Sequence, residues 1–284
     1  MRVLLTGADG RLGSALQARL SAHGHTVSGY DVTRMDVTDW DTVRAAFDET
    51  EPELVVHCAA LTAVDQCAED PDRALLVNGY GTQTIAQACQ DHNARLVYIS
   101  TNEVFDGRAT RPYLEYDTPN PINPYGYSKW VGEQIVRELV PQHIIVRTAW
   151  LYAHGGSNFI HAILRAAREG QPLRVVTNEI GSPTYTNDLA DALIQLIETG
   201  RNGTYHLVNE GQVSRFGLAR CVLDLAGYRQ IPLEPIALAE YRRASRPPEY
   251  SALRNFAAAQ MGIRLRPWPD ALAAFLRAEG LLQE

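Results

Sequence analysis

Three polar residues, Thr101, Asn102 and Glu103, follow one another directly after the apolar run RLVYIS (95–100). Such a run is typical of a buried strand. In an open parallel α/β sheet, ligands bind beyond the carboxyl ends of the strands. A hydroxyl, an amide and a carboxylate at that edge therefore predict a reactive site. The triplet alone leaves open whether the site transfers a hydride or eliminates water.

A tyrosine and a lysine stand four residues apart in YGYSK (125–129), at the start of a helical pattern. Residues at i and i+4 share a helix face, so Tyr125 and Lys129 can act together. The ammonium and the positive charge of a cofactor would lower the pKa of the phenol towards neutrality, which suits an acid/base. Thr101 would hydrogen-bond the substrate oxygen that Tyr125 protonates. The predicted catalytic set is Thr101, Tyr125 and Lys129.

The elements that must position these residues alternate regularly in the first half of the chain. We expect strands at 2–6, 25–30, 53–58, 95–100 and 143–148, and helices at 11–23, 39–49, 72–92 and 125–139. Alternating strands and helices indicate right-handed βαβ units and a parallel sheet covered on both faces. The predicted fold class is α/β, a doubly wound parallel sheet of the Rossmann type.

The pattern loosens after about residue 150. Helices are expected at 158–169, 187–199, 216–226 and 268–279, and short strands at 173–177 and 204–208. We interpret residues 1–150 as a dinucleotide-binding Rossmann domain. Residues 151–284 form mainly a smaller, C-terminal substrate-binding lobe in this interpretation, with a segment near 178–209 returning to the core.

A glycine-rich turn, GADGRLG (7–13), connects the first expected strand to the first expected helix. Gly7 permits a tight turn, Gly10 lets the backbone approach a pyrophosphate, and Gly13 allows close packing of helix and strand. The helix N-terminus then offers N–H groups and a partial positive charge to that anion. The turn predicts a dinucleotide cofactor.

Residues after the second and third strands extend this cofactor site. Asp31 could hold both ribose hydroxyls and would repel a 2′-phosphate, which favours NADH over NADPH, although Arg34 blurs that preference. The MDV segment (35–37), with Asp36 and Val37, resembles the corner that receives adenine in related folds. Small residues in CAALT (58–62) would let a dinucleotide pass close to the backbone, but they fit a tightly packed strand end equally well.

Composition excludes several other classes of function. The chain has 284 residues and a net charge of −7 without a Lys/Arg-rich run, so nucleic acid is not an expected partner. No stretch approaches a membrane span, and no ligand spacing supports a metal site. The N-terminus leads straight into a strand, and four cysteines lack C-x-x-C spacing, so we expect a reduced, cytoplasmic protein. Association as a homodimer is left open.

Beyond these general motifs, the chain resembles the extended short-chain dehydrogenase/reductases, and within them the dTDP-4-dehydrorhamnose reductase family, along nearly its whole length. The more specific supporting stretches are GSPTY (181–185) and RPPEYSAL (246–253). Other similar stretches are AALTAVDQCAEDP (59–71), STNEVFDG (100–107), PNPINPYGYSK (119–129), RTAWLY (147–152) and GIRLRPW (262–268).

The resemblance implies reduction, by NADH or NADPH, of the 4-keto group of a nucleotide-linked 4-keto-6-deoxy sugar, as in dTDP-L-rhamnose biosynthesis. The implied substrate contacts are Thr101, Asn102, Glu103, Tyr125 and Trp150, with Trp150 packing against the sugar. The implied cofactor contacts are Gly7, Gly10, Arg11, Leu12, Gly13, Asp31, Asp36, Val37, Ala59, Ala60, Leu61, Thr62 and Lys129.

Departures from the family pattern keep two alternatives open. Where the family usually has Asp-Tyr after the threonine, this chain has Asn102 and Glu103. Sugar-nucleotide dehydratases, which with epimerases belong to another extended branch, carry Thr-Asp-Glu there, but an asparagine cannot supply their acid proton. Tyr127 stands where arginine is common, and Val32 stands where an arginine is frequent, which weakens the case for NADPH. A non-catalytic, dinucleotide-binding regulatory subunit is the second alternative.

Overall fold

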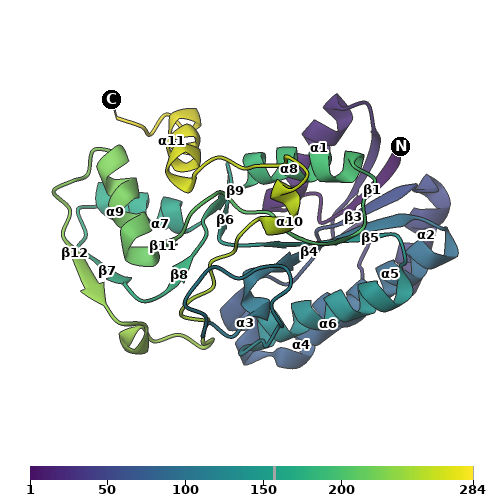
Figure 1. The fold of residues 1–284 in the computed structure, drawn as a ribbon, viewed down its shortest axis with the longest axis horizontal. Helices are drawn as coiled ribbons and strands as arrows, with labels where there is room; N and C mark the ends of the chain where they lie inside the picture. The colour runs from purple at the N-terminus through teal and green to yellow at the C-terminus, as the bar shows by residue number, and fades with distance from the viewer. Residues whose placement is uncertain (156–157, 284) are drawn as a thin grey trace.

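A six-stranded, all-parallel sheet forms the centre of the computed structural model, which describes residues 1–155 and 158–283 (Figure 1). The strands run in the order β10-β5-β4-β3-β1-β2. Their bounds are β1 Arg2–Thr6, β2 Thr26–Tyr30, β3 Leu54–His57, β4 Arg95–Thr101, β5 His143–Thr148 and β10 Gly203–His206. The central strands are continuous apolar runs because a parallel sheet is buried on both faces. This architecture confirms the predicted α/β fold class.

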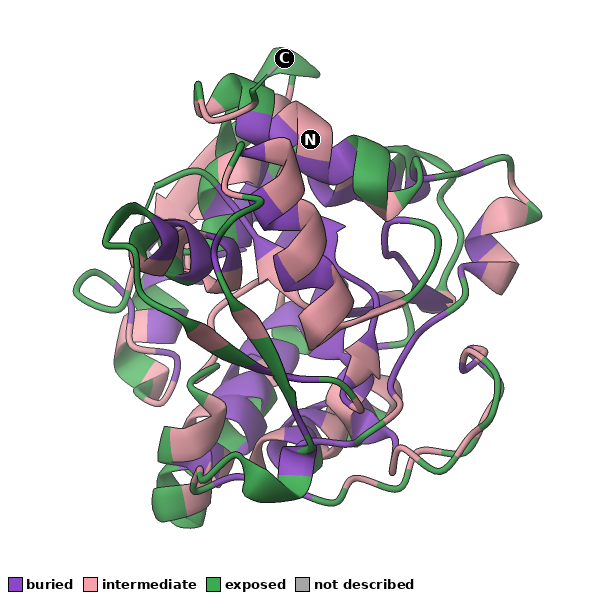
Figure 2. Cartoon of the chain, turned by 90° about the vertical axis from the view of Figure 1, so that its left-hand side faces the viewer, coloured by how far each residue is buried: buried purple, intermediate pink, exposed green. Residues whose placement is uncertain are grey.

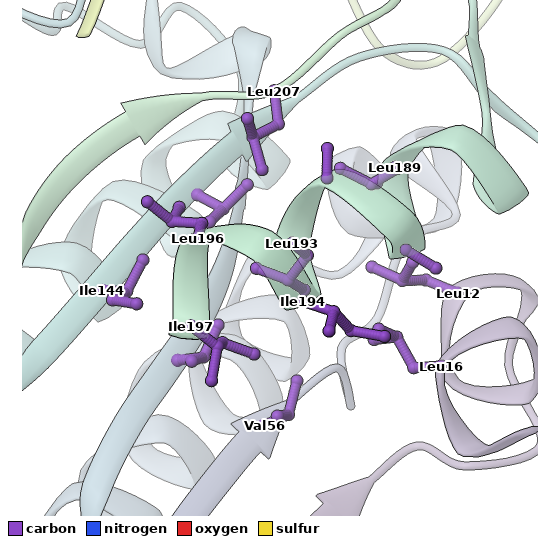
Figure 3. Close-up of a cluster of buried hydrophobic side chains, with 14 of the residues drawn as sticks. Leu12, Leu16, Val56, Ile144, Leu189, Leu193, Ile194, Leu196, Ile197 and Leu207 are labelled. Atoms are coloured by element: carbon purple, nitrogen blue, oxygen red, sulfur yellow. The ribbon is translucent and has the colours of Figure 1, made fainter. Parts of the chain in front are cut away.

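Helices cover both faces of the sheet. One face carries α1 (Arg11–Ala22), α8 (Thr186–Glu198) and the short α10 (Phe256–Ala259), and the other carries α2 (Trp40–Thr50), α5 (Gly81–Asp91) and α6 (Pro124–Leu139). Figure 3 shows leucines and isoleucines of α1 and α8 meeting Val56 and Ile144 of the sheet. Burying each such side chain stabilises the fold by about 1.5–3 kcal/mol.

The chain leaves the sheet after β5 to build a lobe at its carboxyl edge and comes back through α8 and β10. The lobe contains α7 (Phe159–Arg168), α9 (Arg215–Leu225) and α11 (Trp268–Ala278), which share one apolar core. Three two-stranded sheets flank them: β6 (Leu151–Tyr152) with β9 (Thr184–Tyr185), β8 (Ile180–Gly181) with β11 (Val213–Ser214), and β7 (Leu173–Val176) with β12 (Leu233–Ile236). Figure 2 shows buried residues concentrated on the inner faces of these elements.

One predicted helix is interrupted. Instead of a single helix over 72–92, the chain forms α4 (Pro71–Leu75), a π-helical segment (Leu76–Tyr80) and α5, preceded by α3 (Val64–Glu69). Asn78 lies in the π-helical segment, and its side chain bonds the backbone N–H and C=O of Leu61 at 2.8 and 3.0 Å and the Ser128 hydroxyl at 2.9 Å. The segment thus ties the loop after β3 to α6.

Short 3₁₀ turns complete the fold at Asn102–Val104 and Leu238–Glu240. The other predicted elements agree with the structure to within two residues at each end. Among the helices of the described residues, none has both the length and the apolarity needed to cross a bilayer.

Candidate active site

A cavity of about 910 Å³ opens at the carboxyl ends of the central strands. It lies where the strand order reverses, since β1 pairs with β2 on one side and β3 on the other, which is the expected place for a ligand in such a sheet. The structure brings every predicted site residue to its wall: Gly7, Gly10, Arg11, Leu12, Gly13, Asp31, Asp36, Val37, Ala59, Ala60, Leu61, Thr62, Thr101, Asn102, Glu103, Tyr125, Lys129 and Trp150.

The glycine turn is shaped by close backbone approach. Gly7 has a φ of +62°, and a Cβ there would come within 2.8 Å of the Ala59 nitrogen. A Cβ on Gly13 would collide with the carbonyl oxygen of Gly7. Gly10 is the N-cap of α1 and makes no side-chain cap hydrogen bond, and the start of the helix carries a partial positive charge that attracts an anion. These features fit an anion-binding cradle.

The two aspartates at the far end of the cavity are fixed by their own loops. Oδ1 of Asp31 accepts hydrogen bonds from the Thr33 hydroxyl at 2.6 Å and from the Thr33 and Arg34 nitrogens at 2.9 and 3.1 Å. The Thr33 hydroxyl is the largest cause that lowers the pKa of Asp31 below its ordinary value. Asp36 is held in the same way by the backbone and hydroxyl of Thr38. Asp31 therefore presents an ionised carboxylate to the cavity.

The catalytic candidates come from β4 and α6. Thr101 ends β4, and its hydroxyl donates to Oδ1 of Asn102 at 3.2 Å. Asn123 caps α6, because its side-chain oxygen accepts from the Gly126 nitrogen at 2.8 Å, and this fixes the first helical turn that carries Tyr125. Lys129 follows one turn later and is 2% exposed. The end of β4 and the start of α6 thereby bring Thr101, Tyr125 and Lys129 to one wall of the cavity.

The protonation of this pair differs from the sequence-based expectation. Burial, followed by the negative charge of Glu103, raises the pKa of Tyr125 above its ordinary value, whereas we expected it to be lowered. Burial also lowers the pKa of Lys129 to about 7. The neighbouring ammonium alone does not lower the pKa of Tyr125, because the loss of water around the phenol outweighs it. The expectation also counted the positive charge of the cofactor, which acts only when the cofactor is bound. A protonated phenol remains the form that an acid requires.

Lys129 lies against an aromatic ring. Its ammonium is 4.1 Å from the ring centroid of Tyr98, and the Tyr98 hydroxyl donates to the Lys129 carbonyl at 3.2 Å. Cation–π attraction favours a charged ammonium at this distance. This contact opposes part of the effect of burial on Lys129.

A buried ion pair underlies the site and was missed from the sequence. Glu133 of α6 receives two bonds from Arg147 of β5, at 2.8 and 2.7 Å, and one from the Ser100 hydroxyl of β4 at 2.6 Å. Burial pushes the pKa of Glu133 upward, but Arg147 and Ser100 outweigh it, so the pKa of the carboxyl stays below its ordinary value. The arginine inside the apolar run HIIVRT could have indicated a buried ion pair, because a buried cation needs a charged partner.

Asn102 and Glu103, the residues that depart from the family pattern, take different positions. Asn102 donates to the Ser251 hydroxyl at 2.7 Å and so connects the end of β4 to the RPPEYSAL stretch. Glu103 accepts a 2.7 Å bond from Asn123, and burial raises the pKa of its carboxyl to about 7. The structure thus places a carboxyl that titrates near neutrality beside Tyr125 in the cavity wall.

Trp150 has an unusual backbone conformation and side-chain contacts, neither of which the sequence indicated. Its φ is +45°, which is uncommon for a bulky residue. A Cβ on Gly181 would come within 2.5 Å of the indole, so the glycine of the GSPTY stretch is required by this contact. The Arg215 guanidinium carbon lies 3.5 Å from the ring centroid. Arg215 also lines the cavity and was not predicted as a site residue.

The glycine turn, the parallel sheet and the Tyr/Lys pair at one cavity define an extended short-chain dehydrogenase/reductase. The chain belongs to the family described as "RmlD substrate binding domain", whose model matches residues 1–280.

Similar proteins agree with this assignment over nearly full length. The chain is 40% identical to the spore coat polysaccharide biosynthesis protein SpsK of Bacillus subtilis over 97% of each chain. It is 38% identical to a dTDP-4-dehydrorhamnose reductase of Mycolicibacterium smegmatis, covering 95% of this chain and 84% of that protein. The crystal structure of a dTDP-4-dehydrorhamnose reductase from Bacillus anthracis in complex with NADP matches with a TM-score of 0.94 and 37% identity, covering 98% and 99%.

Proposed function

We propose that this protein reduces the 4-keto group of a nucleotide-linked 4-keto-6-deoxy sugar with NAD(P)H, as a dTDP-4-dehydrorhamnose reductase does. The observation that carries the proposal is the meeting of Thr101, Tyr125 and Lys129 in the same cavity as the glycine turn. Family membership and the full-length similarity to reductases support the substrate class.

The cavity residues fit a nicotinamide dinucleotide. The uncapped start of α1 and the side-chain-free Gly10 suit a pyrophosphate, Asp31 suits a ribose, and Lys129 suits the second ribose. When bound, the reduced cofactor supplies a hydride to the keto carbon.

Residues of the protein itself donate the proton and position the sugar. Because burial keeps Tyr125 protonated at neutral pH, its hydroxyl can donate a proton to the keto oxygen as negative charge develops there. In the free protein the Thr101 hydroxyl donates its single proton to Oδ1 of Asn102, so it would have to rotate away from Asn102 to give the keto oxygen a second hydrogen bond. Asn102, itself bonded to Ser251, positions the Thr101 side chain in the cavity wall.

The same contacts favour reduction over the alternative eliminations. Both functional groups of the Asn102 amide are engaged, with Thr101 and with Ser251, and an amide has no acid proton to give. A leaving hydroxyl would have to be protonated by another group. The joint presence of Thr101, Tyr125 and Lys129 in one wall also favours an enzyme over a binding subunit.

Oxidation of NADH and NADPH, followed by absorbance, tests the proposal, with dTDP-4-dehydro-6-deoxy-L-mannose generated in situ from dTDP-glucose. We expect oxidation that depends on both the protein and the sugar. Dinucleotide binding without oxidation across a panel of nucleotide-linked keto sugars would contradict the proposed reaction.

We further propose that Asp31 disfavours NADPH relative to NADH. Its ionised carboxylate would face the 2′-phosphate, and like charges repel. Replacing Asp31 by alanine is expected to raise the kcat/KM ratio of NADPH to NADH by about five- to tenfold. Steady-state kinetics with both cofactors measure this ratio. Asp36→Ala is the matched control, since adenine is common to both cofactors; an unchanged ratio in Asp31→Ala would remove Asp31 from the ribose.

Cofactor binding should weaken in alkaline solution because of Lys129. In the free protein its pKa is about 7, so the ammonium that would hold the ribose is present below pH 7 and lost above it. We expect the NADPH dissociation constant to rise between pH 7 and pH 9, by at most about tenfold per unit. Titrations monitored by nucleotide fluorescence measure this slope. The Lys129→Met variant should bind weakly with no such slope, and an equal slope in both proteins would contradict the assignment.

The proposal extends to the cellular location and the oligomeric state of the protein. The cysteines at 58, 67, 89 and 221 are free thiols, which supports a reducing, cytoplasmic setting. Self-association as a homodimer is compatible with exposed aromatic residues such as Tyr80 and Tyr127 near and on α6.

A further inference from the structure

One face of the Trp150 indole is covered by the guanidinium of Arg215. The Arg215 guanidinium carbon lies over it at 3.5 Å from the ring centroid, and Gly181 lies directly against its six-membered ring. A sugar that approached the covered face would meet the guanidinium first. The indole therefore serves as a support for Arg215, through stacking of two planar groups.

Arg215 is held in place from three sides. It begins α9, and its Nε donates to Oε1 of the buried Glu179 at 2.9 Å, while its backbone N–H donates to the Glu179 carbonyl at 3.1 Å. The Phe159 ring centroid lies 5.2 Å from the guanidinium carbon. The bond to Glu179 uses Nε, and a guanidinium carries four further N–H donors on its terminal nitrogens. Such fixed, planar donors match phosphate oxygens.

The position of Arg215 separates it from the cofactor cradle. Among the described residues after 150 that line the cavity, Arg215 is the one that carries a charge. The glycine turn lies at the start of α1, whereas α9 begins in the lobe on the other side of the strand ends (Figure 1). Thr101 and Tyr125 lie in the same wall, at the end of β4 and the start of α6. A ligand that extends from these residues into the lobe reaches a cation at Arg215.

A nucleotide-linked sugar brings its own anion into this part of the cavity. With its keto carbon beside Tyr125, the rest of the molecule must leave the cofactor side, and its diphosphate needs a positive partner to offset the loss of water. We propose that Arg215, supported on Trp150 and anchored by Glu179, binds the diphosphate of the substrate. This inference rests on the proposed function for the direction of the sugar, and it assigns Arg215 a ligand of stated chemistry.

Binding of nucleoside diphosphates to the NADPH-loaded protein tests this role. We would titrate dTDP, UDP and GDP, and the matching nucleosides, into wild-type protein and the Arg215→Met and Arg215→Lys variants by calorimetry. For the preferred diphosphate, Arg215→Met should weaken binding about 10- to 100-fold, the usual effect of losing a charge-assisted hydrogen bond. Arg215→Lys should retain only part of the affinity, because it keeps the charge but loses the planar donors and the stacking on Trp150. Nucleoside and NADPH affinities should be unchanged in both.

Arg174→Met is the matched control, since Arg174 is an exposed lobe arginine paired with Glu234 on the neighbouring strand. It should leave all affinities unchanged. Melting temperatures of the variants separate loss of a contact from loss of the fold.

The outcomes also distinguish this inference from the proposed function. Arg215-dependent binding of any one diphosphate supports the inference, even if no keto sugar is reduced. Equal loss of nucleoside and diphosphate affinity in Arg215→Met would overturn it, as would unchanged diphosphate affinity or the absence of diphosphate binding by the wild-type protein. Turnover of the dTDP-linked keto sugar with unaltered KM in Arg215→Met would overturn the inference while leaving the reductase assignment intact.

Discussion

Replacing Tyr125 by phenylalanine is expected to lower kcat by about 10²- to 10⁴-fold, the usual contribution of a positioned acid. Phenylalanine keeps the ring and removes only the hydroxyl that would protonate the keto oxygen. NADPH affinity should stay nearly intact, because Lys129 and the glycine turn are unchanged. Single-turnover oxidation of NADPH, together with a binding titration, measures the two effects separately.

Tyr127→Phe is the control for that experiment. Tyr127 lies on the same helix, two residues further on, and is 46% exposed, so loss of its hydroxyl should leave turnover unchanged. Unchanged turnover in Tyr125→Phe would remove the phenol from the chemistry. A large loss in both variants would point to damage of α6 itself.

Replacing Glu133 by glutamine is expected to lower the free energy of unfolding by about 3–5 kcal/mol, because Arg147 then remains buried without its charge partner. For a chain of this size the melting temperature should fall by roughly 5–10 °C. Calorimetric unfolding of the two proteins measures both quantities. Glu133 is fully buried and Arg147 is 2% exposed at the side chain, so solvent gives little screening.

Glu234→Gln provides the matched comparison. Glu234 pairs with Arg174 at 3.4 Å, but both side chains are more than half exposed, and such a pair contributes about 0–1 kcal/mol. A fall in melting temperature of the same size in both variants would mean that the buried Glu133 pair stabilises the fold no more than the exposed one. A negligible fall in Glu133→Gln would also contradict the expected stabilisation.

Most of the sheet and its helices could be predicted from the sequence because their signals are local. Largely apolar runs mark β1, β3, β4 and β5, and the glycine turn marks the crossing from β1 to α1. Since all these strands end at one edge, the residues that follow them had to meet. This explains why Thr101, Tyr125 and the glycine turn could be assigned to one site before their contacts were known.

The remaining features depend on residues far apart in the chain. Arg215 reaches Trp150 across 65 positions, and Asn102 reaches Ser251 across 149, so no periodic pattern connects them. The pKa of Tyr125 depends on burial, which composition does not give. The π-helical segment was predicted as regular helix because its apolar spacing resembles one. Asn78, a polar residue within that spacing, was the sign in the sequence that the helix is not regular there.

The return of the chain to the sheet sets the order in which the protein can be assembled. Strand β10 and helix α8 complete the edge and one face of the sheet, yet they lie after the first part of the lobe in the sequence. During synthesis, the first five strands therefore emerge with the surface later covered by Leu189, Leu193 and Ile197 still open to water. At roughly 5–20 residues per second, the ribosome needs several seconds to supply that cover. In this interval the nascent chain carries exposed apolar surface, the condition in which folding intermediates are prone to aggregate.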